Sequence, residues 1–285
     1  MSHRTVTIFV LTLLAGFFSF AGGRTLLLPA AVEAPRQSVP YSFDGVETFL
    51  YKAHWNGIPV ATAEIQGAPL TVDGKAHYRV DVQAKTTSIL DFIWRMRDSI
   101  SSTFNAKTLQ PRQFVFSQRE NSRSTDTTAL FDQDSSKWSV HRQRGKKIDK
   151  FDFISNNTFD PITAVYMLRS IEFKVGDRVE FEVFGGKSRY WLTLDVVGRE
   201  SINLDSGPIE AYKIIPQIKN INKEEGYAER MRRAVVWVSA DERKIPLRAV
   251  TSVFIGSVQL EMQTGGFPLK KAAAAQLHPQ ASVLD

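Results

Sequence analysis

The sequence contains no cysteine, and this absence removes several classes of protein at once. Without thiols the chain cannot form disulfides, bind a metal through thiolates, use a cysteine nucleophile or carry the acylated N-terminal cysteine of a bacterial lipoprotein. Histidine is also scarce: His54, His77 and His141 are the only ones far from the termini, and none has a second ligand at metal-binding spacing. No serine lies in a Gly-x-Ser-x-Gly elbow. We therefore predict no catalytic, cofactor or metal residues and no enzymatic activity.

The charge is moderately basic. Lys and Arg number 36 against 30 Asp and Glu, which gives a net charge of +6 and a pI near 9.4. Such a surface attracts anions, including lipid head groups. Nucleic acid is not an expected partner, because no predicted helix is a basic recognition helix and the chain has an export signal.

A single long apolar run lies at the N-terminus. His3 and Arg4 precede the apolar stretch Ile8–Ala21, which is the charged start and hydrophobic middle of a signal peptide. Residues 1–34 are therefore predicted to be a signal peptide. They could instead be an uncleaved anchor, because Leu26–Leu28 extends the run toward the roughly 20 residues that span a bilayer.

The export signal predicts a protein of the periplasm or of the periplasmic face of a membrane in a Gram-negative envelope. Residues 41–265 are predicted to form a single β-rich domain. Residues 266–285 lack a periodic apolar face that could pack against the domain, and we expect them to be a disordered tail.

Most of the predicted domain alternates apolar and polar residues with the period of β-strands. Asn56-Gly57 between two alternating runs predicts a tight hairpin. Residues 235–250 predict another, whose turn lies in the charged insert Ser239 to Arg243 and in which Trp237 faces the core.

Helical spacing appears in only two places. Apolar residues predict a short helix over 88–96, and Asp160 followed by Pro161 predicts the start of a second helix. The fold class is therefore mainly β, with a curved antiparallel sheet or half-open barrel covered by two short helices.

Four stretches together resemble the exported family numbered 3108 among the domains of unknown function. They are LYKAHWNGIPVATAEI, FIWRMRDSISSTFNAKTLQPRQF, DPITAVYMLRSIEFKVGD and VVWVSADERKIPLRAVTSVFIGSVQLEM. This resemblance implies a mostly β domain without an established activity, and therefore no site residues. A weaker similarity, in architecture alone, connects the pattern of strands, covering helix and Trp-containing hairpin to the LolA-type lipoprotein carriers.

One group of large apolar residues could line a pocket for an acyl chain, although side chains at these periods also suit a packed core. The group is Phe92, Ile93, Trp94, Met96, Phe181, Tyr190, Trp191 and Trp237. A second group of basic residues could contact anions or lipid head groups. It is Arg95, Arg97, Arg142, Arg144, Lys146 and Lys147.

These observations predict a non-enzymatic envelope protein that binds or carries a lipid-like amphiphile in an apolar cavity. The alternative is an envelope scaffold that binds another protein through an exposed strand edge.

Overall fold

The structure is a computed structural model that describes residues 45–221, 234–253 and 255–263. The predicted signal or anchor, residues 1–34, and the predicted tail, residues 266–285, lie outside the described residues. Within the described ranges, no helix has both the length and the apolar character needed to cross a membrane.

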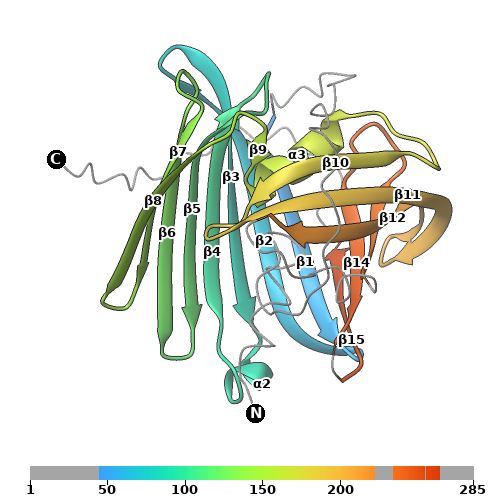
Figure 1. The fold of residues 1–285 in the computed structure, drawn as a ribbon. Coiled ribbons are helices and arrows are strands. Elements are labelled where there is room, and N and C mark those ends of the chain that lie inside the picture. Colours follow the sequence, from blue (N-terminus) through green and yellow to red (C-terminus); the bar gives the residue numbers. More distant parts are fainter. Residues whose placement is uncertain (1–44, 222–233, 254, 264–285) are drawn as a thin grey trace.

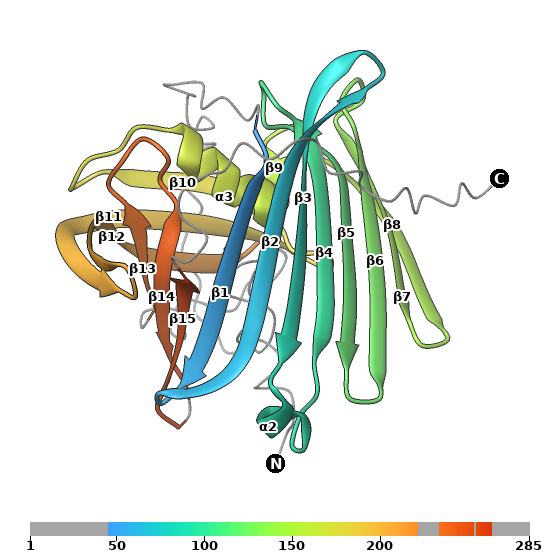
Figure 2. The same cartoon turned by 180° about the vertical axis from the view of Figure 1, so that it is seen from behind.

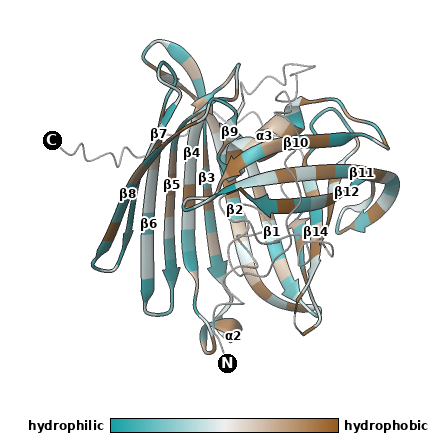
Figure 3. Ribbon diagram, in the orientation of Figure 1, coloured by the Kyte–Doolittle hydropathy of each residue, from teal (hydrophilic) through white to brown (hydrophobic). Residues whose placement is uncertain are grey.

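The strands join into one 15-stranded sheet that curves strongly and leaves its two edges unjoined (Figure 1). Apolar and polar residues alternate along many of these strands (Figure 3), so the sheet has one buried face and one solvent-exposed face. The strands are β1 (Glu47–Trp55), β2 (Ile58–Val72), β3 (Lys75–Thr86), β4 (Arg97–Asn105), β5 (Pro111–Glu120), β6 (Arg123–Asp132), β7 (Lys137–Arg144), β8 (Lys147–Ile154), β9 (Thr158–Phe159), β10 (Arg178–Phe184), β11 (Arg189–Leu204), β12 (Gly207–Asn220), β13 (Ala234–Ser239), β14 (Pro246–Ser252) and β15 (Ser257–Gln263). The predicted mainly β, curved and open architecture is confirmed.

The strand order is β8-β7-β6-β5-β4-β3-β2-β1-β15-β14-β13-β12-β11-β10-β9. The chain thus starts in the middle of the sheet, runs outward to β8, crosses to β9 at the far edge and returns to β15 beside β1. Neighbouring strands are antiparallel except β9 and β10. The antiparallel meander follows from the short turns between alternating runs.

The hairpin predicted at Asn56-Gly57 joins β1 to β2. Both residues have positive φ, 48° and 84°, which is the conformation of the two-residue turn that Asn-Gly favours. The predicted hairpin of residues 235–250 is also present, as β13 and β14.

Helix α3 (Pro161–Ser170) lies on the concave side of the sheet (Figures 1 and 2). Its start is the predicted one: Asp160 accepts hydrogen bonds from the backbone N–H groups of Ile162 and Thr163, at 2.8 and 3.0 Å, and Pro161 occupies the first turn. The other Asp160 oxygen accepts a hydrogen bond from the Ser102 hydroxyl of β4, which ties the helix to the sheet.

The helix predicted over residues 88–96 is shorter than expected. Helix α2 (Ser88–Asp91) is a single turn at the end of β3, and the chain returns to the sheet before Arg97. The Met96 N–H donates to the Thr86 hydroxyl at 3.0 Å, and Met96 forms a bridge with Glu120. The prediction was wrong beyond Asp91 because strand pairing outweighs the helical spacing of the apolar residues.

Candidate functional site

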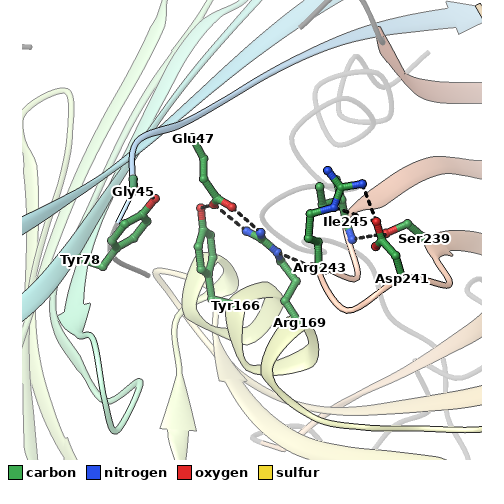
Figure 4. Close-up of polar contacts among 9 residues, drawn as sticks. All are labelled: Gly45, Glu47, Tyr78, Tyr166, Arg169, Ser239, Asp241, Arg243 and Ile245. Carbon is green, nitrogen blue, oxygen red and sulfur yellow. Dashed lines mark hydrogen bonds and ion pairs between the residues drawn. The ribbon is translucent and has the colours of Figure 1, made fainter. Parts of the chain in front are cut away.

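A buried ionic cluster connects α3, β1 and the hairpin of β13 and β14 (Figure 4). The guanidinium of Arg169 donates to both carboxylate oxygens of Glu47, at 2.6 and 2.8 Å, and its Nε donates to the backbone carbonyl of Arg243 at 3.1 Å. The Tyr166 hydroxyl donates to Glu47 at 3.0 Å. Both charges are buried, so their stability depends on these contacts.

The charged insert of the hairpin positions the Arg243 carbonyl (Figure 4). Asp241 accepts a hydrogen bond from the Ser239 hydroxyl at 2.6 Å and forms an ion pair with the Arg243 side chain. The Ile245 N–H donates to the Ser239 hydroxyl at 2.8 Å, which closes the turn. The Asp-x-Arg turn therefore has a structural purpose: it presents a carbonyl to a buried arginine of α3.

The tyrosines of this region are poor candidates for proton transfer. Burial, reinforced by the Glu47 carboxylate, raises the pKa of Tyr166 well above its usual value. Burial also raises the pKa of Tyr51, whose hydroxyl donates to the Pro246 carbonyl at 2.8 Å. Both phenols stay protonated and act as hydrogen-bond donors, so we assign the ionic cluster to stability.

A second feature is an aromatic cluster where the β10–β11 hairpin meets the concave face of β6, β7 and β8. Trp138 stacks on Phe153 with ring centroids 5.6 Å apart, and the Phe184 ring lies 5.7 Å from Trp138 and 5.2 Å from Phe153. The members of the aromatic cluster are Phe131, Trp138, Phe151, Phe153 and Phe184.

One polar atom in the aromatic cluster has no partner. Trp138 is fully buried, and its indole Nε1 has no hydrogen-bond acceptor in the described part of the chain. Buried tryptophan N–H groups usually find a partner, because an unpaired buried donor costs free energy. The guanidinium of Arg189 lies 5.0 Å from the centre of the Phe153 ring, at the border of the cluster, and forms an ion pair with Glu182.

The predicted pocket residues do not gather around one space. Trp94, Met96 and Phe181 belong to the main core, whereas Tyr190 packs in a separate small cluster with Ile218 and Ala234.

Phe92 and Ile93 are exposed on the loop after α2. Trp191 is half-buried. The sequence did not single out Trp138, Phe151 or Phe153, because their alternation looks like that of any buried strand.

Trp237 does not have the predicted core position. It is half-buried, its indole N–H donates to Glu200 on β11 at 2.7 Å, and the Lys213 ammonium lies 5.7 Å from the centre of its ring. The register shift between β13 and β14 next to Trp237 skips Leu247 of β14, so β13 itself keeps its alternation. Ala234 and Val238 are buried on the inner face, which leaves Trp237 on the outer face.

The predicted basic residues occupy two places at one end of the sheet. Arg144, Lys146 and Lys147 are exposed at the tip of the β7–β8 hairpin, and Arg142 is half-buried below them. The others lie beside α2: Arg95 is exposed, and Arg97 forms a two-point ion pair with Asp91.

The sequence did not reveal a pair of neighbouring carboxyl groups, of which one is buried and the other half-buried. Asp98 on β4 accepts a hydrogen bond from the Arg119 N–H at 2.6 Å, while the Oε1 atom of Glu120 has no partner in the described residues. Burial raises the pKa of Asp98 to about 7; burial and the nearby Asp98 raise that of Glu120 to about 7. Only the register of β4 against β5 brings these two residues together.

The fold and these clusters define a class: a mainly β protein built from a single curved, open sheet around one inner helix. The chain belongs to the family described as "Protein of unknown function (DUF3108)", whose model matches residues 50–263. No curated protein matches the chain.

Among solved structures, the chain is similar to the beta-barrel-like protein of domain of unknown function DUF1849 from Brucella abortus. That similarity has a TM-score of 0.49 with 8% sequence identity, and it covers 77% of this chain and 96% of that one. The likeness to LolA-type carriers is not confirmed by these comparisons.

Proposed function

We propose that this chain is a non-enzymatic cell-envelope protein that binds a lipid-like amphiphile at the aromatic cluster. The observation that supports this most directly is the fully buried indole N–H of Trp138, which has no acceptor within the described residues. A ligand that supplies a carbonyl or carboxylate oxygen to this donor would remove the cost of leaving it unpaired.

The surroundings of Trp138 suit a ligand with an apolar body. The rings of Phe153 and Phe184 lie against the indole, and such rings favour an acyl chain over a polar metabolite. Arg189, at the border of the cluster, forms an ion pair with Glu182, and an anionic head group would compete with Glu182 for its guanidinium. A lipid-like anion therefore matches the apolar lining and would meet a cation at its border.

The ligand would reach the cluster by displacing the tip of the β10–β11 hairpin. Gly185 and Gly186 form this tip, and the Gly185 N–H donates to the Ser188 carbonyl at 3.1 Å. The tip touches the concave face through side-chain contacts: a β-carbon built on Gly186 would lie 3.5 Å from Thr127 and 3.7 Å from Phe114. Side-chain contacts of this kind separate more readily than a hydrogen-bonded strand ladder.

The cellular setting is part of the same proposal. The charged start and apolar run of residues 1–34 are typical of an export signal. The lack of cysteine makes the fold independent of the redox state of its compartment. We therefore place the domain in the periplasm or on the periplasmic face of a membrane.

The decisive test is the substitution Trp138→Phe, which removes the N–H and keeps an aromatic ring. Titration with a fluorescent long-chain fatty acid should show binding by the native chain and roughly tenfold weaker binding by this variant, since a hydrogen bond to a charged group contributes about 1.5–3 kcal/mol. Trp94→Phe is the matched control, because Trp94 is a buried tryptophan without a ring contact to the cluster. Equal affinity of Trp138→Phe and the native chain would refute the site.

A second candidate function is the envelope scaffold, and the edge strand β8 favours it. Among the described strands β8 pairs with β7 alone, which leaves its other edge for a strand from a partner protein. Lys147 and Lys150 on this strand oppose unspecific pairing. Purification without lipid that yields one stoichiometric protein partner, lost when that edge is blocked, would support the scaffold over the amphiphile.

A further inference from the structure

Several chain connections meet at one end of the sheet, at the bottom of the molecule in Figure 1, and we call this end the rim. It comprises the Asn56-Gly57 turn, the α2 loop of residues 87–96, the β5–β6 and β7–β8 turns, and the turn around Ile255. Backbone hydrogen bonds join its parts: the Thr87 N–H donates to Val60, and the Asn121 N–H donates to Arg95. These bonds connect the α2 loop to β2 on one side and to the β5–β6 turn on the other.

Large apolar side chains are exposed along this rim. Phe92 is 94% exposed, Ile93 79% and Ile89 67%, all on the α2 loop. Ile58 and Ile255 are exposed in two neighbouring turns, and the Trp55 indole N–H holds those turns together by donating to the Ile255 carbonyl at 2.7 Å. Apolar groups gathered at one end of a soluble domain mark an interaction surface.

The α2 loop holds its apolar side chains outward in a fixed frame. Leu90 and Trp94 of the same loop are buried and anchor it to the core. Asp91 bonds Arg97 at 2.6 and 3.1 Å and accepts a hydrogen bond from the Thr86 hydroxyl. The α2 loop is therefore held in place, and the exposure of Phe92 and Ile93 is a fixed feature of the fold.

Positive charge lies at the same end of the sheet as the apolar side chains. Arg95, Arg144 and Lys146 are exposed at the rim and form no ion pair with any residue that the structure describes. The half-buried carboxylate of the α2 loop, Asp91, is neutralised by Arg97. An apolar tip bordered by unpaired cations complements an anionic lipid surface, where the apolar side chains enter the interface and the cations meet phosphates.

We propose that the rim docks this protein onto an anionic membrane surface, with Ile89, Phe92 and Ile93 inserted among the lipid head groups. This inference goes beyond amphiphile binding and does not depend on it, because the rim residues are not part of the aromatic cluster. It also gives three of the six predicted basic residues a common task, since Arg95, Arg144 and Lys146 lie at the same end of the sheet.

Cosedimentation of the full chain with vesicles tests the rim. The native chain should bind phosphatidylcholine vesicles that contain phosphatidylglycerol more tightly than vesicles of phosphatidylcholine alone, and added salt should weaken the binding. The triple variant Ile89→Ser/Phe92→Ser/Ile93→Ser should bind about tenfold or more weakly. In Arg95→Gln/Arg144→Gln/Lys146→Gln, each lost charge should lower binding to the anionic vesicles about fivefold.

The matched control is Ile154→Ser, because Ile154 is 76% exposed and lies at the opposite end of β8. This variant should bind as the native chain does. A native affinity in the triple apolar variant would overturn the proposal, and so would identical binding to both kinds of vesicle. If the rim instead recognises a protein, the rim variants keep their vesicle binding and the proposal fails.

The absence of cysteine permits a local probe. Phe92→Cys labelled with an environment-sensitive dye should shift its emission to the blue on addition of anionic vesicles, whereas the same dye on Ile154→Cys should not. Sedimentation with vesicles without a shift at position 92 would show attachment through another part of the chain. Fatty-acid binding by the rim variants stays native, so failure here is distinguishable from failure of the aromatic site.

Discussion

The Arg169 guanidinium and the Glu47 carboxylate form a buried two-point ion pair between residues 122 positions apart in the sequence. Glu47 begins the central strand β1, and Arg169 lies near the end of α3. The pair fixes the helix against the middle of the sheet, while the Arg243 carbonyl completes the guanidinium's contacts from the hairpin.

Breaking this pair should destabilise the fold strongly. Glu47→Gln leaves Arg169 buried without its counter-charge, and we expect a loss of about 3–5 kcal/mol in the free energy of unfolding, measured by urea denaturation. Arg112→Gln breaks an exposed pair with Asp73 and should cost about 1 kcal/mol or less. Similar costs for the two variants would contradict the buried role of Glu47.

Gly67 should not tolerate a side chain. A β-carbon at this position would lie 2.6 Å from the Tyr78 hydroxyl and 3.0 Å from the Tyr166 hydroxyl. We expect Gly67→Ala to cost about 1–3 kcal/mol through overpacking. Gly198→Ala is the control, since no atom lies within 4 Å of its added carbon. The melting temperature of Gly67→Ala should therefore be lower than that of Gly198→Ala. Equal melting temperatures would contradict the close approach of Gly67 to the two tyrosines.

Two tryptophans should differ in their contribution to stability. Trp138 is fully buried, so Trp138→Ala should cost about 3–5 kcal/mol. Trp237 is half-buried on the outer face, so Trp237→Ala should cost about 1–2 kcal/mol. Thermal unfolding of both variants provides the comparison, and the reverse order would mean that the β13 register is misassigned.

The stability should decrease as the pH rises toward neutrality. Asp98 and Glu120 have pKa values near 7 in the folded chain, whereas carboxyl groups in the unfolded chain titrate near 4. Between these values the folded state binds more protons, so the free energy of unfolding falls from about pH 4 to about pH 7. Asp98→Asn/Glu120→Gln should flatten this part of the urea-denaturation profile. If the double variant keeps the same slope of the free energy of unfolding against pH, other titrating groups cause the pH dependence.

Much of the fold follows from local patterns in the sequence. Asn56-Gly57 specifies its own turn, Asp160-Pro161 specifies a helix start, and the alternation along the strands specifies which side chains face inward. Each signal depends on residues a few positions apart, and each is present in the structure.

The parts that the sequence did not reveal depend on distant partners. The short α2 results from pairing between Met96 and Glu120, and the Trp237 indole N–H donates to Glu200, which is 37 positions away in the sequence. Trp138 on β7 is covered by Phe184 of the β10–β11 hairpin, which is 46 positions away in the sequence. These contacts between distant residues depend on the curvature of the whole sheet, which no short stretch of sequence encodes.

The placement of β1 next to β15 links the two ends of the described chain. During synthesis the ribosome releases β1 early, yet its second neighbour, β15, is the last of the described strands to emerge. Until then, Leu50 to Trp55 present an unsatisfied backbone edge that other chains could join. A chain truncated before Ser257 would keep this edge open permanently, and we expect such a product to aggregate.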